Sequence, residues 1–297
     1  MIGYEVHILF GELSEQGPVH CCIALLLYLD WSCCMANDLI HRSTGILWGL
    51  TKCGKTTFLM SLPGRILYVM IDPDGDESLP ELPERIKIIR LYPKTDAEII
   101  RMLEKNIPIH LTKHADTYDS CVIDSITSIG RCALNVAIEE NVGASKRDGF
   151  VPTLSAPGQA AYGARTQHII EITNKVLRAT ATVGKHCWFT AHEDEAKTNA
   201  AGDIMHITMA LSGKTINGAG LNVSEIWHMR LRDKEQWISI APCRSRKPMG
   251  TRMFDIMGEP EFQLKFDPDL GPDQPHSIAR WFQKYQDGGR KKLSLPK

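Results

Sequence analysis

The chain has 297 residues, of which 43% are hydrophobic and 23% charged, a composition typical of globular proteins and a length that suits one large domain or a domain with appendages. No apolar run reaches the roughly 18 residues that a membrane-spanning helix needs, so we expect no membrane association. The formal net charge of -1 argues against a molecule that binds polyanions over its whole surface, but it allows a local basic surface.

Nine cysteines are present, an odd number, and no two of them form a CxxC pair. This arrangement gives little support to a disulfide framework or to a zinc site. We therefore expect reduced thiols in a cytoplasmic protein.

Residues 1–34 differ from the rest of the chain, because they contain four of the nine cysteines and an apolar stretch at 21–29. Residues 1–20 contain no Lys or Arg, which argues against a secretory signal. Two interpretations remain open: translation begins at Met35, or the segment is a short ordered extension that adds an edge strand or a helix. We thus divide the chain into this doubtful extension, one main domain at 35–270, and a short helix with a basic tail at 271–297.

After this extension, short apolar segments alternate with helical segments. Strands are predicted at residues 46–48, 66–71, 86–91, 120–124, 186–191, 225–231, 236–241 and 262–266. Helices are predicted at residues 55–61, 95–105, 126–140, 159–182 and 277–286, with long polar loops at 144–158 and 193–212. The alternation predicts an α/β fold with a mainly parallel central sheet, helices on both faces and antiparallel strands toward the C-terminus. Ligands of such sheets bind beyond the carboxyl ends of the strands.

A phosphate-binding motif, the P-loop, lies between the first predicted strand and the first predicted helix. Its sequence is Gly49-Leu50-Thr51-Lys52-Cys53-Gly54-Lys55-Thr56, followed by Thr57. The glycines allow backbone N–H groups to wrap a phosphate next to a helix N-terminus. Lys55 can reach the β and γ phosphates, and the Thr56 hydroxyl can bind Mg²⁺. Because the motif has the strand–loop–helix context that it requires, residues 49–57 are predicted to bind ATP with Mg²⁺.

Carboxylates follow two of the later strands. Asp124 ends the strand at 120–124, where a carboxylate can hold the magnesium ion or its water. Asp72 and Asp74 follow the strand at 66–71, where a carboxylate can orient and deprotonate the attacking water. The alternative for this second pair is an Asp-Pro-Asp-Gly turn that serves only the backbone geometry.

The order of these motifs resembles that of the RecA-type ATPases. Members of that family carry a GKTT loop, a strand ending in Asp-x-acid and a strand ending in Asp-Ser, which correspond here to residues 54–57, 72–74 and 124–125. The resemblance covers roughly residues 45–266 and is greatest to phage RecA-like proteins that promote single-strand annealing. It implies a RecA-like P-loop NTPase core with Asp74 as the catalytic base. The family has a glutamate there, one methylene longer than Asp74.

The resemblance also implies roles for residues farther along the chain. His192, after the strand at 186–191, would be the sensor of the γ-phosphate; the alternative is a capping or exposed histidine. Arg244 and Arg246, after the strand at 236–241, would reach the ATP of a neighbouring subunit, because guanidinium groups suit the charge that develops on the transferred phosphoryl group. The alternative is a solvated hairpin turn. A trans-acting pair implies a homo-oligomer, either a ring or a filament.

Two loops of this family face single-stranded DNA, and here they are the loops at 144–158 and 193–212. Residues 144–190 hold six basic residues and two acidic ones, a balance that favours phosphate contacts, whereas the second loop is more acidic than basic. By resemblance, we expect DNA contacts from Lys146, Arg147 and Lys197.

These features together predict an ATP-hydrolysing protein that acts on single-stranded DNA in phage-type recombination or annealing, in the host cytoplasm if it is phage-encoded. The alternative is a P-loop ATPase of another class, such as a regulatory or packaging motor, that does not bind single strands. A small-molecule kinase is disfavoured, because the two loops show no acceptor pocket and no Arg-rich lid.

Overall fold

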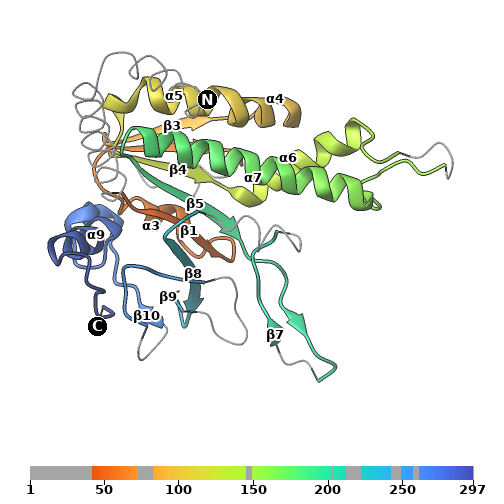
Figure 1. The fold of residues 1–297 in the computed structure, drawn as a ribbon. Coiled ribbons are helices and arrows are strands. Elements are labelled where there is room, and N and C mark those ends of the chain that lie inside the picture. Colours follow the sequence, from red (N-terminus) through yellow and green to blue (C-terminus); the bar gives the residue numbers. More distant parts are fainter. Residues whose placement is uncertain are drawn as a thin grey trace, which may run out of the picture. The chain divides into compact units, whose positions relative to one another are not determined.

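The computed structural model of the chain describes residues 42–72, 83–144, 149–201, 204–211, 222–241, 249–256 and 261–296. Its central sheet is formed by β1 Thr44–Gly49, β2 Ile66–Met70, β3 Ile86–Arg90, β4 Ser120–Asp124, β5 His186–His192, β8 Glu225–Arg232, β9 Glu235–Ser239 and β10 Glu261–Gln263. In the described residues the strand order is β10-β9-β8-β1-β5-β4-β2-β3 (Figure 1). The strands from β8 to β3 in this order pair in parallel, and β9 and β10 pair antiparallel. This arrangement confirms the predicted mainly parallel α/β fold with antiparallel strands toward the C-terminus.

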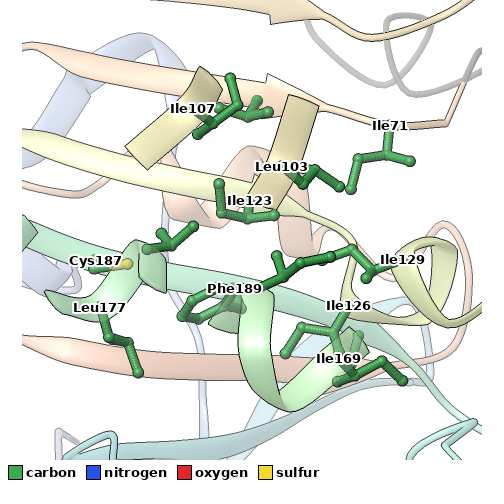
Figure 2. Close-up of a cluster of buried hydrophobic side chains, with 14 of the residues drawn as sticks. Ile71, Leu103, Ile107, Ile123, Ile126, Ile129, Ile169, Leu177, Cys187 and Phe189 are labelled. Atoms are coloured by element: carbon green, nitrogen blue, oxygen red, sulfur yellow. The ribbon is translucent and has the colours of Figure 1, made fainter. Parts of the chain in front are cut away.

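One face of the sheet is covered by four helices. They are α4 Asp96–Arg101, α5 Ile107–Lys113, α6 Ile126–Glu139 and α7 Gly158–Thr182. The strand residues Ile123 and Phe189 lie in one buried cluster with Ile126 of α6 and Ile169 of α7 (Figure 2). No helix in the described part of the chain is both long and apolar enough to cross a membrane.

Among the described residues, the opposite face carries the helices α3 Lys55–Leu59 and α9 Ile278–Asp287. Because successive strand residues point to opposite faces, Trp188 lies on this side of the sheet while Phe189 lies on the other. The ring of Trp188 is 4.9 Å from that of Trp227, which is 5.9 Å from Trp281 of α9. These contacts include α9 in the same core as the sheet.

The start of α6 brings polar side chains to the carboxyl edge of the sheet. Ser125 separates β4 from α6 and is the N-cap residue, because its hydroxyl accepts the backbone N–H of Ser128 at 3.1 Å. This bond satisfies one of the N–H groups that a helix start leaves without a partner. The first two turns of α6 therefore begin directly beside the end of β4.

The helix predicted at 95–105 is longer than expected. A π-helical turn, Met102–Asn106, joins α4 to α5, so that the helical segment continues to Lys113. Pro108 lies in the first turn of α5, where its missing N–H is tolerated. The helical segment therefore continues past the proline.

The loop predicted at 193–212 contains a small antiparallel hairpin, formed by β6 Lys197–Thr198 and β7 Ile204–His206. Strands of two and three residues are too short to show an alternating pattern, which is why the sequence suggested only an irregular segment.

The C-terminal segment, predicted as a loose basic tail, packs against the core. The backbone N–H of Leu293 donates to Met253 at 2.8 Å, and its carbonyl accepts the N–H of Asp255 at 2.8 Å. Leu293 and Leu295 pack against the buried cluster that contains Trp188, Trp227 and Trp281. In the sequence, the basic residues near the end of the chain indicated a solvated tail, and the packing of Leu293 and Leu295 was not predicted.

Candidate nucleotide-binding site

The P-loop connects β1 to α3, and its two glycines are favoured by positive φ angles and by close contacts with neighbouring atoms. Gly49 has φ 156°, and a Cβ atom there would lie 2.0 Å from the carbonyl oxygen of Met229. Gly54 has φ 96°, and a Cβ atom there would lie 2.1 Å from Nε2 of Gln236. Gln236 also donates to the carbonyl of Cys53 at 3.2 Å. The loop is thus fixed from the side by β8 and β9.

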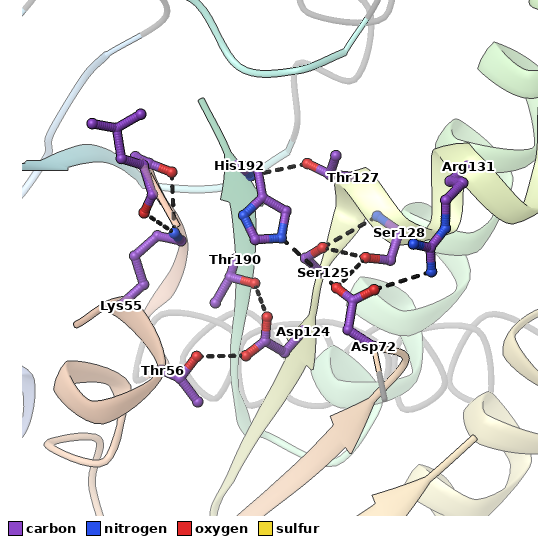
Figure 3. A network of polar contacts seen from close by, with 12 residues as sticks. Lys55, Thr56, Asp72, Asp124, Ser125, Thr127, Ser128, Arg131, Thr190 and His192 are labelled. Carbon is purple, nitrogen blue, oxygen red and sulfur yellow. Dashed lines mark hydrogen bonds and ion pairs between the residues drawn. The ribbon is translucent and has the colours of Figure 1, made fainter. Parts of the chain in front are cut away.

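Lys55 begins α3, and its buried side chain turns back onto the loop. Its ammonium group donates to the carbonyl oxygens of Gly49 at 3.0 Å and of Leu50 at 2.7 Å (Figure 3). These acceptors are uncharged, and a hydrogen bond between two ionised groups is stronger than one to a neutral acceptor. A phosphate group in the loop can therefore replace the carbonyls as the partner of Lys55.

Asp124 joins three elements at the sheet edge. Its Oδ2 accepts a hydrogen bond from Thr56 Oγ1 at 2.8 Å, and its Oδ1 accepts one from Thr190 Oγ1 (Figure 3). Thr56 belongs to α3, Asp124 ends β4, and Thr190 lies on β5. The described residues contain no cluster of three or more His, Cys, Asp or Glu side chains that could enclose a metal ion. A cation here would bind through Thr56 and Asp124 and would take its other oxygen ligands from phosphate and water, as Mg²⁺ does in phosphoryl-transfer sites.

Asp72, two residues beyond β2, is held by the start of α6. Its Oδ1 accepts a hydrogen bond from Arg131 Nη2 at 3.1 Å, its Oδ2 accepts one from Ser128 Oγ, and Nε2 of His192 lies 3.7 Å from Oδ2 (Figure 3). Partial burial by itself raises the pKa of Asp72, but the interactions with His192, Ser128 and Arg131 outweigh it and lower the pKa below its usual value. The Asp72 carboxylate is therefore ionised and already has partners.

His192 ends β5 directly beside the P-loop, in parallel register with Gly49. Its backbone N–H donates to Thr127 Oγ1 of α6 at 2.9 Å. Its Nδ1 atom is buried and has no hydrogen-bond partner among the described residues. The imidazole ring thus has one nitrogen facing Asp72 and one that can still take a partner.

Several site residues were missed by sequence reasoning. Thr190 lies two positions before His192, and the two-residue period of a strand places both on one face. Ser128 and Arg131 are three and six residues beyond Ser125, so one helical turn separates each from the next. These spacings were readable, but the choice of Asp72 as their partner depends on the fold.

Five predicted site residues lie outside the described residues. They are Asp74, Lys146, Arg147, Arg244 and Arg246. The extension predicted at residues 1–34 also lies outside them. The remaining DNA-contact candidate, Lys197, is exposed on β6.

A glycine-containing loop between a buried strand and a helix, with a lysine that turns back onto the loop and a threonine that donates to a carboxylate at the end of β4, defines a P-loop nucleotide-binding protein. The family model described as an AAA domain matches residues 41–258, most of the chain. The chain belongs to this family, and its P-loop is that of a nucleotide-binding ATPase domain. Among curated proteins no match to the chain is found.

Proposed function

We propose that this AAA domain binds and hydrolyses Mg²⁺-ATP in a RecA-like site and acts on single-stranded DNA in phage-type recombination or annealing. The observation that carries the proposal is the convergence of Lys55, Thr56, Asp124 and His192 at the carboxyl ends of β1, β4 and β5 (Figure 3). These elements are the ones on which the RecA resemblance places phosphate binding, metal binding and γ-phosphate sensing.

In this proposal, Lys55 and the loop amides bind the β and γ phosphates. Thr56 and Asp124 hold Mg²⁺. Oγ1 of Thr56 and Oδ2 of Asp124 already lie 2.8 Å apart. Bound Mg²⁺ neutralises charge that develops on the phosphates during transfer. Thr190 fixes the second oxygen of Asp124 and thereby orients its carboxylate.

Asp74 is the proposed catalytic base, and the environment of Asp72 supports this choice. A base must accept a proton from water, and a carboxylate whose pKa is lowered by hydrogen bonds and an ion pair is a poor acceptor. Asp72 has such partners in Ser128 and Arg131. Asp74 is the other carboxylate of the pair.

His192 is the proposed γ-phosphate sensor. It lies next to Gly49 of the P-loop, and the segment that follows it leads to the β6–β7 hairpin, which carries Lys197. A movement of His192 toward a bound phosphate would thus reach the segment proposed to face DNA. Lys146 and Arg147 complete the proposed DNA contacts, and Arg244 and Arg246 the site of an adjacent subunit.

The test is ATP turnover of the purified chain with and without single-stranded DNA at low salt, together with DNA binding and particle mass. We expect DNA to bind and to stimulate turnover in an oligomer. Stimulation of turnover by single-stranded DNA, with no binding to duplex DNA, would support the assignment most directly. Turnover with no effect of DNA and no DNA binding would instead identify a P-loop ATPase of another class, and transfer of phosphate to a small acceptor would identify a kinase.

Lys55→Ala provides the site control. Loss of the ammonium should weaken ATP binding by at least about tenfold, which corresponds to about 1.4 kcal/mol. Lys113→Ala, at the exposed end of α5, removes a lysine of equal charge far along the chain from the P-loop. Equal ATP affinity in both variants would remove Lys55 from the phosphate site.

A further inference from the structure

A buried hydrogen-bonded pair, His228 and Glu193, lies behind the P-loop and has no part in the chemistry described so far. Nε2 of His228 is 2.7 Å from Oε2 of Glu193, and the two side chains are only 2% and 8% exposed. Replacement of a buried polar pair by apolar residues of similar size is often neutral or stabilising, because burial removes polar and charged groups from water. The directional hydrogen bond between His228 and Glu193, however, fixes one relative position of the two elements that carry these residues.

The pair bridges β5 and β8 across the end of β1. Glu193 is the first residue after β5, and its backbone N–H donates to the carbonyl of Gly49 at 2.9 Å. Lys55 donates to that same carbonyl at 3.0 Å. On the other side of β1, the His228 ring lies 4.2 Å from the ring of Trp48. Glu193 therefore shares an acceptor with the P-loop lysine, while its side chain is anchored to β8.

Glu193 is also the root of the segment that contains the β6–β7 hairpin. We call the described residues of this segment, 194–201 and 204–210, the arm. The two ends of the arm meet at this root, because Glu193 forms a backbone bridge with Met209 and the N–H of Ala210 donates to the carbonyl of His192 at 2.8 Å. The backbone N–H of Asp194 donates to the carbonyl of Thr208 at 2.8 Å. Both ends of the arm are thus tied to residues 192 and 193.

We propose that Glu193 and His228 are positioning residues that form a fixed pivot for the arm, so that a nucleotide-dependent movement of His192 turns the arm. The inference rests on the proposed sensing role of His192. When Lys55 leaves the Gly49 carbonyl for a phosphate, Glu193 still holds that carbonyl and stays bound to His228. His192 then moves while Glu193 stays in place, so that the arm turns about Glu193. Without the bond to His228, Glu193 would move together with His192, and the arm would not turn.

The experiment compares hydrogen exchange of the arm amides in the full chain, with and without a non-hydrolysable ATP analogue and Mg²⁺. The test variant, Glu193→Leu/His228→Leu, removes both partners of the hydrogen bond, so that no buried carboxylate or imidazole is left without its partner. The control variant, Arg230→Leu/Glu261→Leu, removes another side-chain pair of β8, whose Nη2–Oε1 distance is 2.7 Å and which bridges β8 and β10 across β9. Glu193→Gln keeps a hydrogen-bonding side chain and serves as the conservative variant.

In the wild type, we expect the analogue to change exchange in the arm. The test variant should bind the analogue within about threefold of the wild-type affinity, which is about 0.7 kcal/mol, but lose most of this change in exchange. The control should keep the change, and Glu193→Gln should restore most of it. A full response in the test variant, or an equal loss in the control, overturns the pivot. Analogue binding without any wild-type response overturns the sensing role of His192 and the pivot with it, while ATP turnover, measured separately, decides the proposed hydrolysis.

Discussion

At the residue scale, the proposed function gives the two carboxylates after β2 different roles. Asp72 interacts with Ser128, Arg131 and His192, and its pKa is lowered by these partners in spite of its burial. Such a group suits the orientation of a histidine better than the acceptance of a proton. In the proposed function, Asp74 is therefore the base.

Asp74→Asn should therefore lower turnover and spare binding. Removal of a general base lowers the rate by about 10² to 10⁴-fold. Single-turnover ATP hydrolysis and analogue affinity measure the two effects separately. Asp116→Asn, at an exposed position in the short 3-10 helix before β4, is the control and should change neither. Unchanged turnover in Asp74→Asn would remove Asp74 as the base.

The lowered pKa of Asp72 also predicts how stability depends on pH. The pKa of the Asp72 carboxyl is about 3.9 in the unfolded chain and lower in the native state. Between these two pKa values, the native state therefore binds fewer protons than the unfolded state. Asp72 therefore stabilises the fold above about pH 4, and this contribution is lost as the pH falls through the native pKa. We expect the difference in the free energy of unfolding between wild type and Asp72→Asn to shrink in acid. Denaturant titrations at a series of pH values measure it, and a constant difference would contradict the ionised assignment.

At the element scale, the start of α6 organises the site. Thr127, Ser128 and Arg131 lie in its first two turns and contact either His192 or Asp72. Ser125 caps this helix and is completely buried. The position of a helix start one residue after β4 thus determines where both site residues are held.

Ser125→Ala should cost about 1 kcal/mol in the free energy of unfolding, which is typical for loss of an N-cap. It should also lower ATP turnover, because the turns that hold Asp72 and His192 become less ordered. Thr95→Ala removes the N-cap of α4, whose hydroxyl accepts the N–H of Glu98 at 3.3 Å, and is the matched control. Thermal or denaturant unfolding should show similar losses, with turnover reduced only in Ser125→Ala. Equal turnover in the two variants would show that the cap of α6 has no special role.

At the scale of the whole molecule, the proposal requires a second copy of the chain to complete the site. Arg246→Ala should then impair only the assembled protein. In a one-to-one mixture with Lys55→Ala, about a quarter of the interfaces of a head-to-tail assembly would join an intact Lys55 to an intact Arg246. Turnover in the mixture above that of either variant alone would demonstrate action in trans. Two inactive proteins that stay inactive when mixed at concentrations where they co-assemble would argue against it.

The sequence alone determined the mainly parallel sheet and the P-loop, because both depend on local patterns. Buried strands show as short apolar runs, and the loop residues are consecutive, so Gly49 and Lys55 could be assigned without a fold. The carboxyl-end rule of parallel sheets also brought Asp124 and His192 to one edge. The short strands of the hairpin after His192 and the packed tail at Leu293 lacked such local patterns.

The tertiary structure decided which side chains are partners at this edge. Asp72 and Ser128 are 56 residues apart, and Glu193 and His228 are 35 apart, so no local period relates them. Their contacts follow from the strand order, which places β1 between β5 and β8 and β4 next to β2. In the sequence, Glu193 was one acid in a polar loop; its burial beside His228 makes it the root of that loop. Burial and long-range pairing are properties of the packed sheet, and they turned the predicted phosphate loop into a site with a defined set of supporting residues.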